Sequence, residues 1–196
     1  MKITLVAIAA GIAILGTAAH AQTNVRVRGT ITAIDGNTLS VKSRDGKDLK
    51  IATPADASVA VATRVKFEDI KDGDFLGATT KPGPNGTEVA VELHYLAPTS
   101  SSGQSAWDLE PNSKMTNAKV AGKVVGSGSH EVTLEWPGGS QKVIVTDATA
   151  LVRTVPGTRA DLKVGEYIFA GAQAGADGAL SASRIQVSKD GVRPPQ

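Results

Sequence analysis

Two copies of one short stretch decide the fold: EDIKDGDF at residues 68–75 and ADLKVGEY at residues 160–167, which lie 92 positions apart. Each copy indicates a single helical turn, then a glycine, then the start of a β-strand at an aromatic residue. A glycine directly after a helical turn commonly adopts positive φ. We therefore predict that the backbone requires Gly73 and Gly165, and that the two stretches are the same joint in two equivalent units.

The similarity extends along both halves of the chain with a period of about 92 residues. Gly29 aligns with Gly122 at the start of the two copies, and both glycines are predicted to be structural. Each copy shows β-branched, alternating runs separated by tight Asp-Gly or Asn-Gly turns. Five strands with one short helix between the third and fourth predict an all-β chain of two tandem OB-like five-stranded Greek-key barrels related by internal duplication. The same order also fits other small barrels and sandwiches.

The ends of the chain differ from these units. Lys2, the apolar run at residues 3–15 and Ala19-His20-Ala21 are typical of a secretory signal. The run is too short to span a bilayer as a helix. We predict cleavage after Ala21 and a periplasmic mature protein without membrane insertion. The predicted boundaries are 1–21 for the signal peptide, 22–97 for the first barrel, 98–117 for a partly ordered linker, 118–188 for the second barrel and 189–196 for a flexible tail.

The amino-acid composition of the chain limits the classes of function that it can have. The chain has no cysteine, so packing rather than disulfides must hold the fold. Its formal net charge is +2 at pH 7, and the charges of both signs are spread along the sequence. Binding to nucleic acid requires a clustered basic surface, so we expect no nucleic-acid partner.

The linker has two parts of different character. Residues 99–105 are rich in serine and are predicted to stay mobile. Residues 106–117 contain Trp107, Leu109 and Met115, which are apolar side chains that an idle linker seldom carries. We predict that this second part docks into the groove between the barrels.

These features together resemble the DUF5666 family of exported bacterial β-barrel domains. The resemblance rests on the glycine-bearing first strand, the Asp-Gly turn, the DLKVGE turn at residues 161–166 and the last strand DGALSASRI at residues 177–185. The Trp107 stretch is similar to the linker of two-copy members. The resemblance covers essentially the whole mature chain and implies a fold and a compartment. The family offers no established activity to carry over.

Candidate metal ligands are few. A metal site needs several nitrogen, sulfur or carboxylate ligands at short range. His94, Met115 and His130 are weak candidates. His94 has a simpler interpretation as part of a strand, and His130 has one as part of a solvated turn. The acidic residues at 68–74 do not follow the spacing of a calcium loop. We expect no cofactor.

Catalytic signatures are absent from the sequence: no Gly-x-Ser-x-Gly elbow, P-loop or dinucleotide fingerprint follows a predicted strand. We therefore predict a protein that is not an enzyme. Trp107, Tyr95 and Trp136 are the aromatic residues that could contact a ligand or partner. The favoured function is a periplasmic non-catalytic binding or adaptor protein for a small ligand or an envelope protein. A low-affinity metal-binding protein of the envelope is the alternative, and an envelope enzyme acting on glycans is the third.

Overall fold

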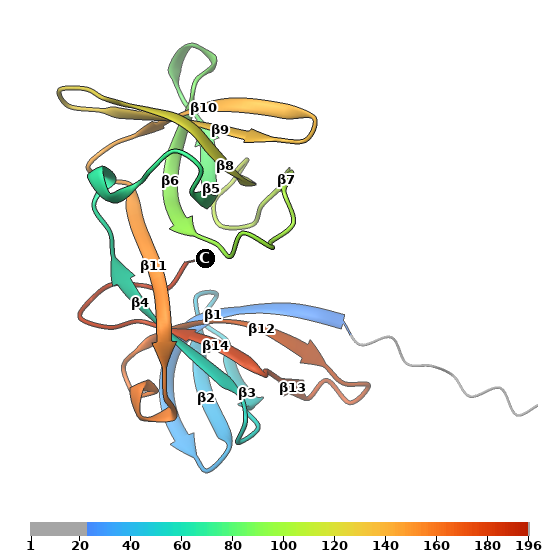
Figure 1. Ribbon diagram of the computed structural model, residues 1–196. Helices are drawn as coiled ribbons and strands as arrows, with labels where there is room; N and C mark the ends of the chain where they lie inside the picture. Colours follow the sequence, from blue (N-terminus) through green and yellow to red (C-terminus); the bar gives the residue numbers. More distant parts are fainter. Residues whose placement is uncertain (1–22, 196) are drawn as a thin grey trace, which may run out of the picture.

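The computed structural model describes residues 23–195 and confirms that the chain is all-β (Figure 1). The strands are β1 (Thr23–Asp35), β2 (Thr38–Ser43), β3 (Asp48–Ala52), β4 (Ser58–Arg64), β5 (Phe75–Pro82), β6 (Glu88–Tyr95), β7 (Gly103–Ala106), β8 (Lys114–Val125), β9 (His130–Trp136), β10 (Gly139–Val145), β11 (Ala150–Gly157), β12 (Tyr167–Ala174), β13 (Leu180–Ser181) and β14 (Arg184–Val187). Short 3-10 turns are η1 (Phe67–Asp69), η2 (Pro84–Gly86) and η3 (Arg159–Asp161). The predicted signal peptide, residues 1–21, lies outside the described residues.

Strands from the middle of the chain form a closed barrel, which we name the central barrel. Its ring of pairings runs β5–β6–β10–β9–β8 and returns to β5, and only the β6–β10 pair is parallel. Alternating residues of these strands fill its core, including the fully buried Leu76, Leu93 and Leu134. The central barrel therefore buries its own apolar core.

Strands from the two ends of the chain form a second ring, which we name the terminal barrel. β1 pairs with β2, β2 with β3, β3 with β13, β13 with β12, and β12 with β1, while β14 follows β13 along the edge of β12 that lies opposite β1. Its core contains the buried side chains Ile31, Leu39, Ile168 and Ile185. Figure 1 shows the two barrels one above the other, joined by β4 and β11.

The predicted barrels at residues 22–97 and 118–188 have the wrong boundaries. Residues 23–52 share a barrel with residues 167–187, and residues 75–95 share one with residues 114–145. We call this arrangement the strand exchange. The reason lies at residues 58–64, which form the extended strand β4. β4 carries the chain from the terminal to the central barrel instead of folding back, and β11 carries it back.

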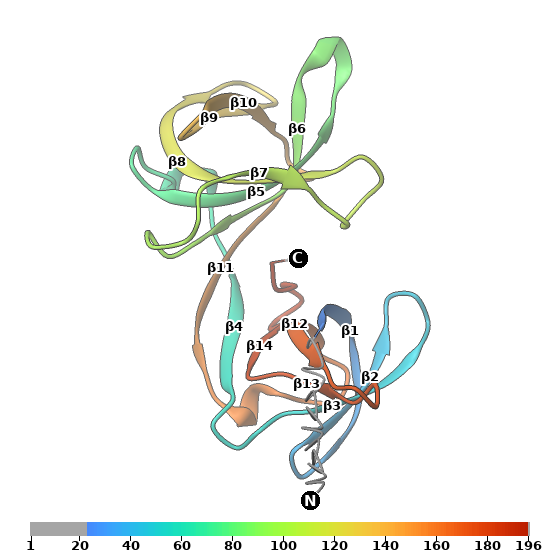
Figure 2. The same cartoon turned by 90° about the vertical axis from the view of Figure 1, so that its right-hand side faces the viewer.

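The two connecting strands pair with each other in an antiparallel ribbon. Their register runs from Val59 opposite Gly157 to Arg64 opposite Val152. β4 also pairs in parallel with β14 of the terminal barrel, and β11 pairs in parallel with β6 of the central barrel. In both views the ribbon spans the gap between the barrels (Figures 1 and 2). Continuous backbone hydrogen bonding therefore links one barrel to the other.

The joints quoted from the sequence have the predicted geometry. Gly73 has φ of 87° and Gly165 has φ of 95°, each shortly after a 3-10 turn. The Gly73 amide donates to the carbonyl of Val120 at 2.8 Å, and the Gly165 amide donates to that of Ile31 at 2.9 Å. Gly73 thus ties the end of its turn to β8, and Gly165 ties the end of its turn to β1.

The alignment of Gly29 with Gly122 is wrong. Gly29 is required by close packing, because an added Cβ would lie 2.3 Å from the carbonyl oxygen of Lys42, whereas a Cβ at Gly122 would meet nothing within 4 Å. Gly29 pairs with Ile168 of β12, Ala118 pairs with Leu76 of β5, and these two partners lie 92 residues apart. By strand register, Gly29 therefore corresponds to Ala118 and not to Gly122. The β8–β9 hairpin is longer than the β1–β2 hairpin, and this shifts the correspondence along the first strand.

The predicted flexible tail, residues 189–196, packs against the rest of the protein through residue 195. Lys189 and Val192 form a bridge, and the Arg193 guanidinium lies 4.5 Å from the centre of the Tyr167 ring. Pro194 and Pro195 are buried. Residues whose sequence is typical of a frayed end therefore pack between the two barrels, where Figure 1 places the C-terminus.

Candidate functional site: a cleft between the barrels

A cleft of about 640 Å³ lies between the two barrels. The central barrel contributes the end of β6 together with β7 and β8, and the terminal barrel contributes β12 and β14. β11 adds Arg153 and Thr154, and the C-terminal segment adds Pro195. Strands of both barrels and the connecting strand β11 thus reach this one space.

Strand alternation explains which side chains face the cleft. On β6, Leu93 packs into the central core, so its neighbour His94 points outward. On the terminal barrel, Ile168 and Ile185 fill the core, and the neighbouring Phe169 faces the cleft. The cleft is therefore lined by the outer faces of two barrels whose inner faces are apolar.

The structure brings together four of the six residues singled out as candidates. His94, Tyr95, Trp107 and Met115 all line the cleft. Tyr95 also packs against the central core, and Met115 is buried on β8. Aromatic candidates and weak metal-ligand candidates therefore share one site.

The other two candidates lie elsewhere, on β9. Trp136 is partly buried against the central core and covers Gly139, where an added Cβ would come within 2.6 Å of the indole. His130 stacks on Phe67 with ring centroids 4.4 Å apart and planes 14° from parallel. Both are packing residues, so Trp136 does not join a ligand site at the cleft and His130 does not join His94.

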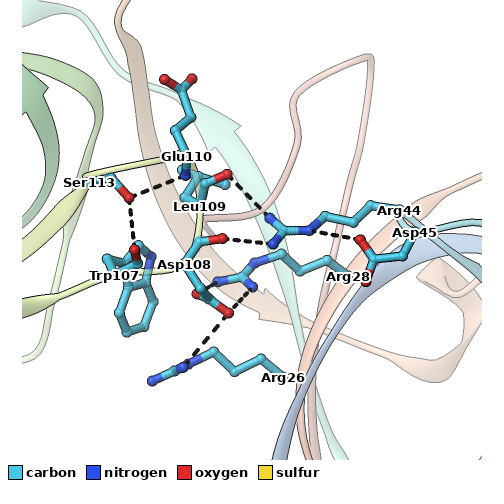
Figure 3. Close-up of polar contacts among 9 residues, drawn as sticks. All are labelled: Arg26, Arg28, Arg44, Asp45, Trp107, Asp108, Leu109, Glu110 and Ser113. Carbon is cyan, nitrogen blue, oxygen red and sulfur yellow. Dashed lines mark hydrogen bonds and ion pairs between the residues drawn. The ribbon is translucent and has the colours of Figure 1, made fainter.

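Residues 107–113 of the predicted docking stretch contact both barrels, whereas residues 114–117 belong to strand β8 of the central barrel; Figure 3 shows the contacts with the terminal barrel. Arg28 of β1 donates two hydrogen bonds to the Asp108 carboxylate, at 2.8 and 3.0 Å. Arg44, just after β2, donates to the Asp108 carbonyl at 2.7 Å. From the central barrel, Lys81 pairs with Glu110 at 3.1 Å. We name residues 107–113 the clamp, because they contact both barrels.

The clamp also has internal order. The Trp107 amide donates to the Ser113 carbonyl at 2.8 Å, and the Ser113 hydroxyl donates to the Trp107 carbonyl at 3.1 Å. Residues 103–105, expected to be mobile with the rest of 99–105, belong to strand β7, which pairs with β8. That expectation was wrong for these three residues because Gln104 bonds Thr116 and Gln141 of the central barrel.

Arginine side chains surround the Trp107 ring. The guanidinium of Arg26 lies 4.2 Å from the ring centre and that of Arg28 lies 5.7 Å from it. Arg28 also lies 5.2 Å from the centre of the Phe169 ring. Its hydrogen bonds to Asp108 hold the pKa of that carboxyl below its usual value. A cation–aromatic stack therefore joins the clamp to the terminal barrel at the edge of the cleft.

His94 makes a buried pair with Glu92. The His94 Nδ1 lies 2.9 Å from a Glu92 carboxylate oxygen, and both residues are buried. The imidazole packs on Gly77 of β5, where an added Cβ would come within 2.4 Å of Nε2. Over residues 23–195, no three His, Asp or Glu residues converge in a metal-binding group.

Two further arginines border the cleft. Arg153 lies with its guanidinium 4.3 Å from the centre of the Tyr95 ring, and Arg184 lies on β14. Both are exposed. Burial and, secondarily, the Asp74 carboxylate raise the pKa of Tyr95, so its hydroxyl stays protonated at neutral pH.

Reading the sequence missed Arg153, Arg184 and Phe169 as site residues. One signal was present: the repeat alignment places Arg184 on Glu92, a reversal of charge at equivalent positions. This charge reversal indicates a site residue only once it is known that β6 and β14 belong to different barrels and face one cleft. The spacing of residues along the chain does not show which strands share a barrel.

The chain matches no protein-family model, no curated protein and no solved structure at a significant level. Within residues 23–195 there is also no helix with the length and hydrophobicity that crossing a bilayer requires. The function must therefore be argued from the cleft.

Proposed function

We propose that this chain is an exported, non-catalytic binding protein whose ligand occupies the cleft between the barrels. The carrying observation is that His94, Tyr95, Trp107 and Met115, which lie on three separate segments, line one space. Its volume of about 640 Å³ falls in the ordinary range of small-molecule sites. That size favours a small ligand over an envelope protein as the partner.

The same proposal includes the origin of the scaffold. We infer two OB-like units related by duplication, in which each unit gives its first three strands to one barrel and its last strands to the other. The 92-residue spacing of the joints and the pairing of Ala62 with Thr154, also 92 residues apart, support this history. It agrees with the resemblance to two-copy DUF5666 proteins, and export to the periplasm is proposed from residues 1–21.

Filling the cleft tests the proposal. Ser105 is exposed on β7 and lines the cleft, so Ser105→Phe inserts a ring there. Ser140, exposed on β10, does not line the cleft, and Ser140→Phe is the matched control. The probes are a neutral dye, N-phenylnaphthylamine, and its anionic relative, anilinonaphthalene sulfonate, followed by dye fluorescence. We expect one-to-one binding of at least one dye that Ser105→Phe removes and Ser140→Phe leaves intact. Dye binding that survives Ser105→Phe contradicts the proposal.

Metal-ion binding is the second candidate, because His94 and Met115 line the same cleft. A site built on His94 requires that a bound ion stabilise the folded state by mass action. The hypothesis predicts that micromolar Zn(II) or Cu(II) raises the melting temperature and that His94→Ala abolishes the rise. His130→Ala is the matched control, because His130 stacks on Phe67 away from the cleft. An unchanged melting temperature with either ion rejects this candidate.

A further inference from the structure

The charges around the cleft are unequal. Asp108 pairs with Arg28 and Arg26, and Glu92 pairs with His94. None of the ion pairs formed within residues 23–195 gives Arg153 or Arg184 a carboxylate partner. Two guanidinium groups therefore reach the cleft without an ion-paired carboxylate from the described part of the chain.

Their positions suit an anionic group better than a neutral one. Arginine stays charged at every physiological pH and presents planar donors that match carboxylate, sulfate and phosphate oxygens. Arg153 enters from β11 and Arg184 from β14, so the two approach the cleft from different strands. A cleft lined by one sign of charge between low-dielectric walls concentrates ligands of the opposite sign.

Part of the remaining lining is apolar. Phe169 and Leu96 are half-buried at the cleft, and Met115 and Pro195 are buried in its wall. Such surfaces gain little from a bare inorganic ion, but they gain from covering an apolar body. A ligand that satisfies both parts of the lining carries an anionic oxygen group on an apolar or aromatic frame.

We propose that the cleft binds a small organic anion, with its carboxylate, sulfonate or phosphate group held by Arg153 and Arg184 and its apolar frame against Phe169 and Met115. This inference rests on the proposed function, because it assigns a ligand class to the same cleft. It extends that function from an unspecified small ligand to a chemical class.

The dye pair isolates the anionic group, because the two dyes share an aromatic frame and differ by the sulfonate. Anilinonaphthalene sulfonate should bind the wild-type protein at least ~10-fold more tightly than N-phenylnaphthylamine, as expected for hydrogen bonds to a charged group. Arg184→Gln and Arg153→Gln should each remove most of this preference while leaving binding of the neutral dye unchanged. Retained binding of the neutral dye shows that the cleft of each variant is intact.

Arg64→Gln is the matched control. Arg64 is an exposed arginine on β4 of the same ribbon, and it does not line this cleft. It should leave the preference for the sulfonate unchanged. If Arg64→Gln lowers the preference as much as Arg184→Gln does, general surface charge explains the result and the inference is wrong.

The remaining outcomes separate the inference from the proposed function. If both dyes bind equally and Ser105→Phe removes both, the cleft is a binding site without preference for anions, and only the inference fails. If neither dye responds to Ser105→Phe, both fail. A sulfonate preference that persists in Arg153→Gln and Arg184→Gln also overturns the inference, because other groups would then hold the anion.

Discussion

The Asp108–Arg28 pair should respond asymmetrically to loss of its two partners. The Arg28 side chain is 3% exposed, whereas that of Asp108 is 48% exposed. Asp108→Ala leaves a buried guanidinium without its carboxylate, and removing one partner of a buried pair typically costs about 3–5 kcal/mol. We expect about 3 kcal/mol here, at the low end, because water reaches the Asp108 side of the pair.

Arg28→Met should cost less. Methionine keeps most of the side-chain volume between the Trp107 and Phe169 rings, and the remaining Asp108 carboxylate can be solvated. The loss is then close to that of a hydrogen bond to a charged group, about 1.5 kcal/mol. The double variant should be more stable than Asp108→Ala alone, because it removes the stranded charge.

Urea unfolding followed by circular dichroism gives the four free energies of this cycle. The control is Asp45→Ala, because Asp45 is an exposed carboxylate 3.6 Å from Arg44. That change should cost less than about 0.5 kcal/mol. If Arg28→Met destabilises the protein as much as Asp108→Ala, or the double variant is the least stable of all, burial of the guanidinium does not control this pair.

Three further predictions test the joints, the clamp and the strand exchange. Gly73→Val and Gly165→Val should each lower stability by about 1–3 kcal/mol through backbone strain at positive φ, and unchanged melting temperatures would refute this. Because folding lowers the pKa of Asp108, the contribution of its carboxylate to stability is complete above the unfolded-state pKa and is lost as pH falls through the folded-state pKa. Quenching of the fluorescence of Trp107 in the clamp should rise in that acidic window, and Asp108→Asn should remove this pH-dependent rise. Residues 66–147 alone should fold as a β-barrel, whereas residues 22–98 should not give a folded monomer; circular dichroism and sedimentation of the two fragments decide this.

Local signals in the sequence were sufficient for the local structure. The joints at Gly73 and Gly165 were predictable because a positive-φ glycine after a helical turn is decided by its immediate neighbours. Docking of the linker was predictable because Trp107 has apolar surface that favours burial, whereas Met115 lies on strand β8 of the central barrel. The all-β class followed from alternation and turn residues alone.

Partner choice between strands was not predictable in the same way. The two strands that follow the joints begin at Phe75 and Tyr167, and the two copies carry similar patterns there. Either could be placed beside either first strand with the same alternation of buried residues. The choice is made by β4 and β11, whose pairing with each other leads the chain away from its own barrel. The error at Gly122 has a similar origin, because hairpin length and not residue identity sets the correspondence.

The strand exchange gives the candidate site its position. The ribbon brings Arg153 to the cleft, and the returning chain brings Phe169 and Arg184 opposite His94. Two devices hold the barrels at this spacing: the β4–β11 ladder and the clamp. The ladder is continuous backbone pairing, whereas the clamp depends on the side-chain contacts of Asp108 and on Lys81 with Glu110. Loss of the Asp108 contacts should therefore loosen the cleft while both barrel cores stay folded. In Asp108→Ala, weaker dye binding at temperatures well below unfolding would show that the clamp shapes the site as well as stabilising the protein.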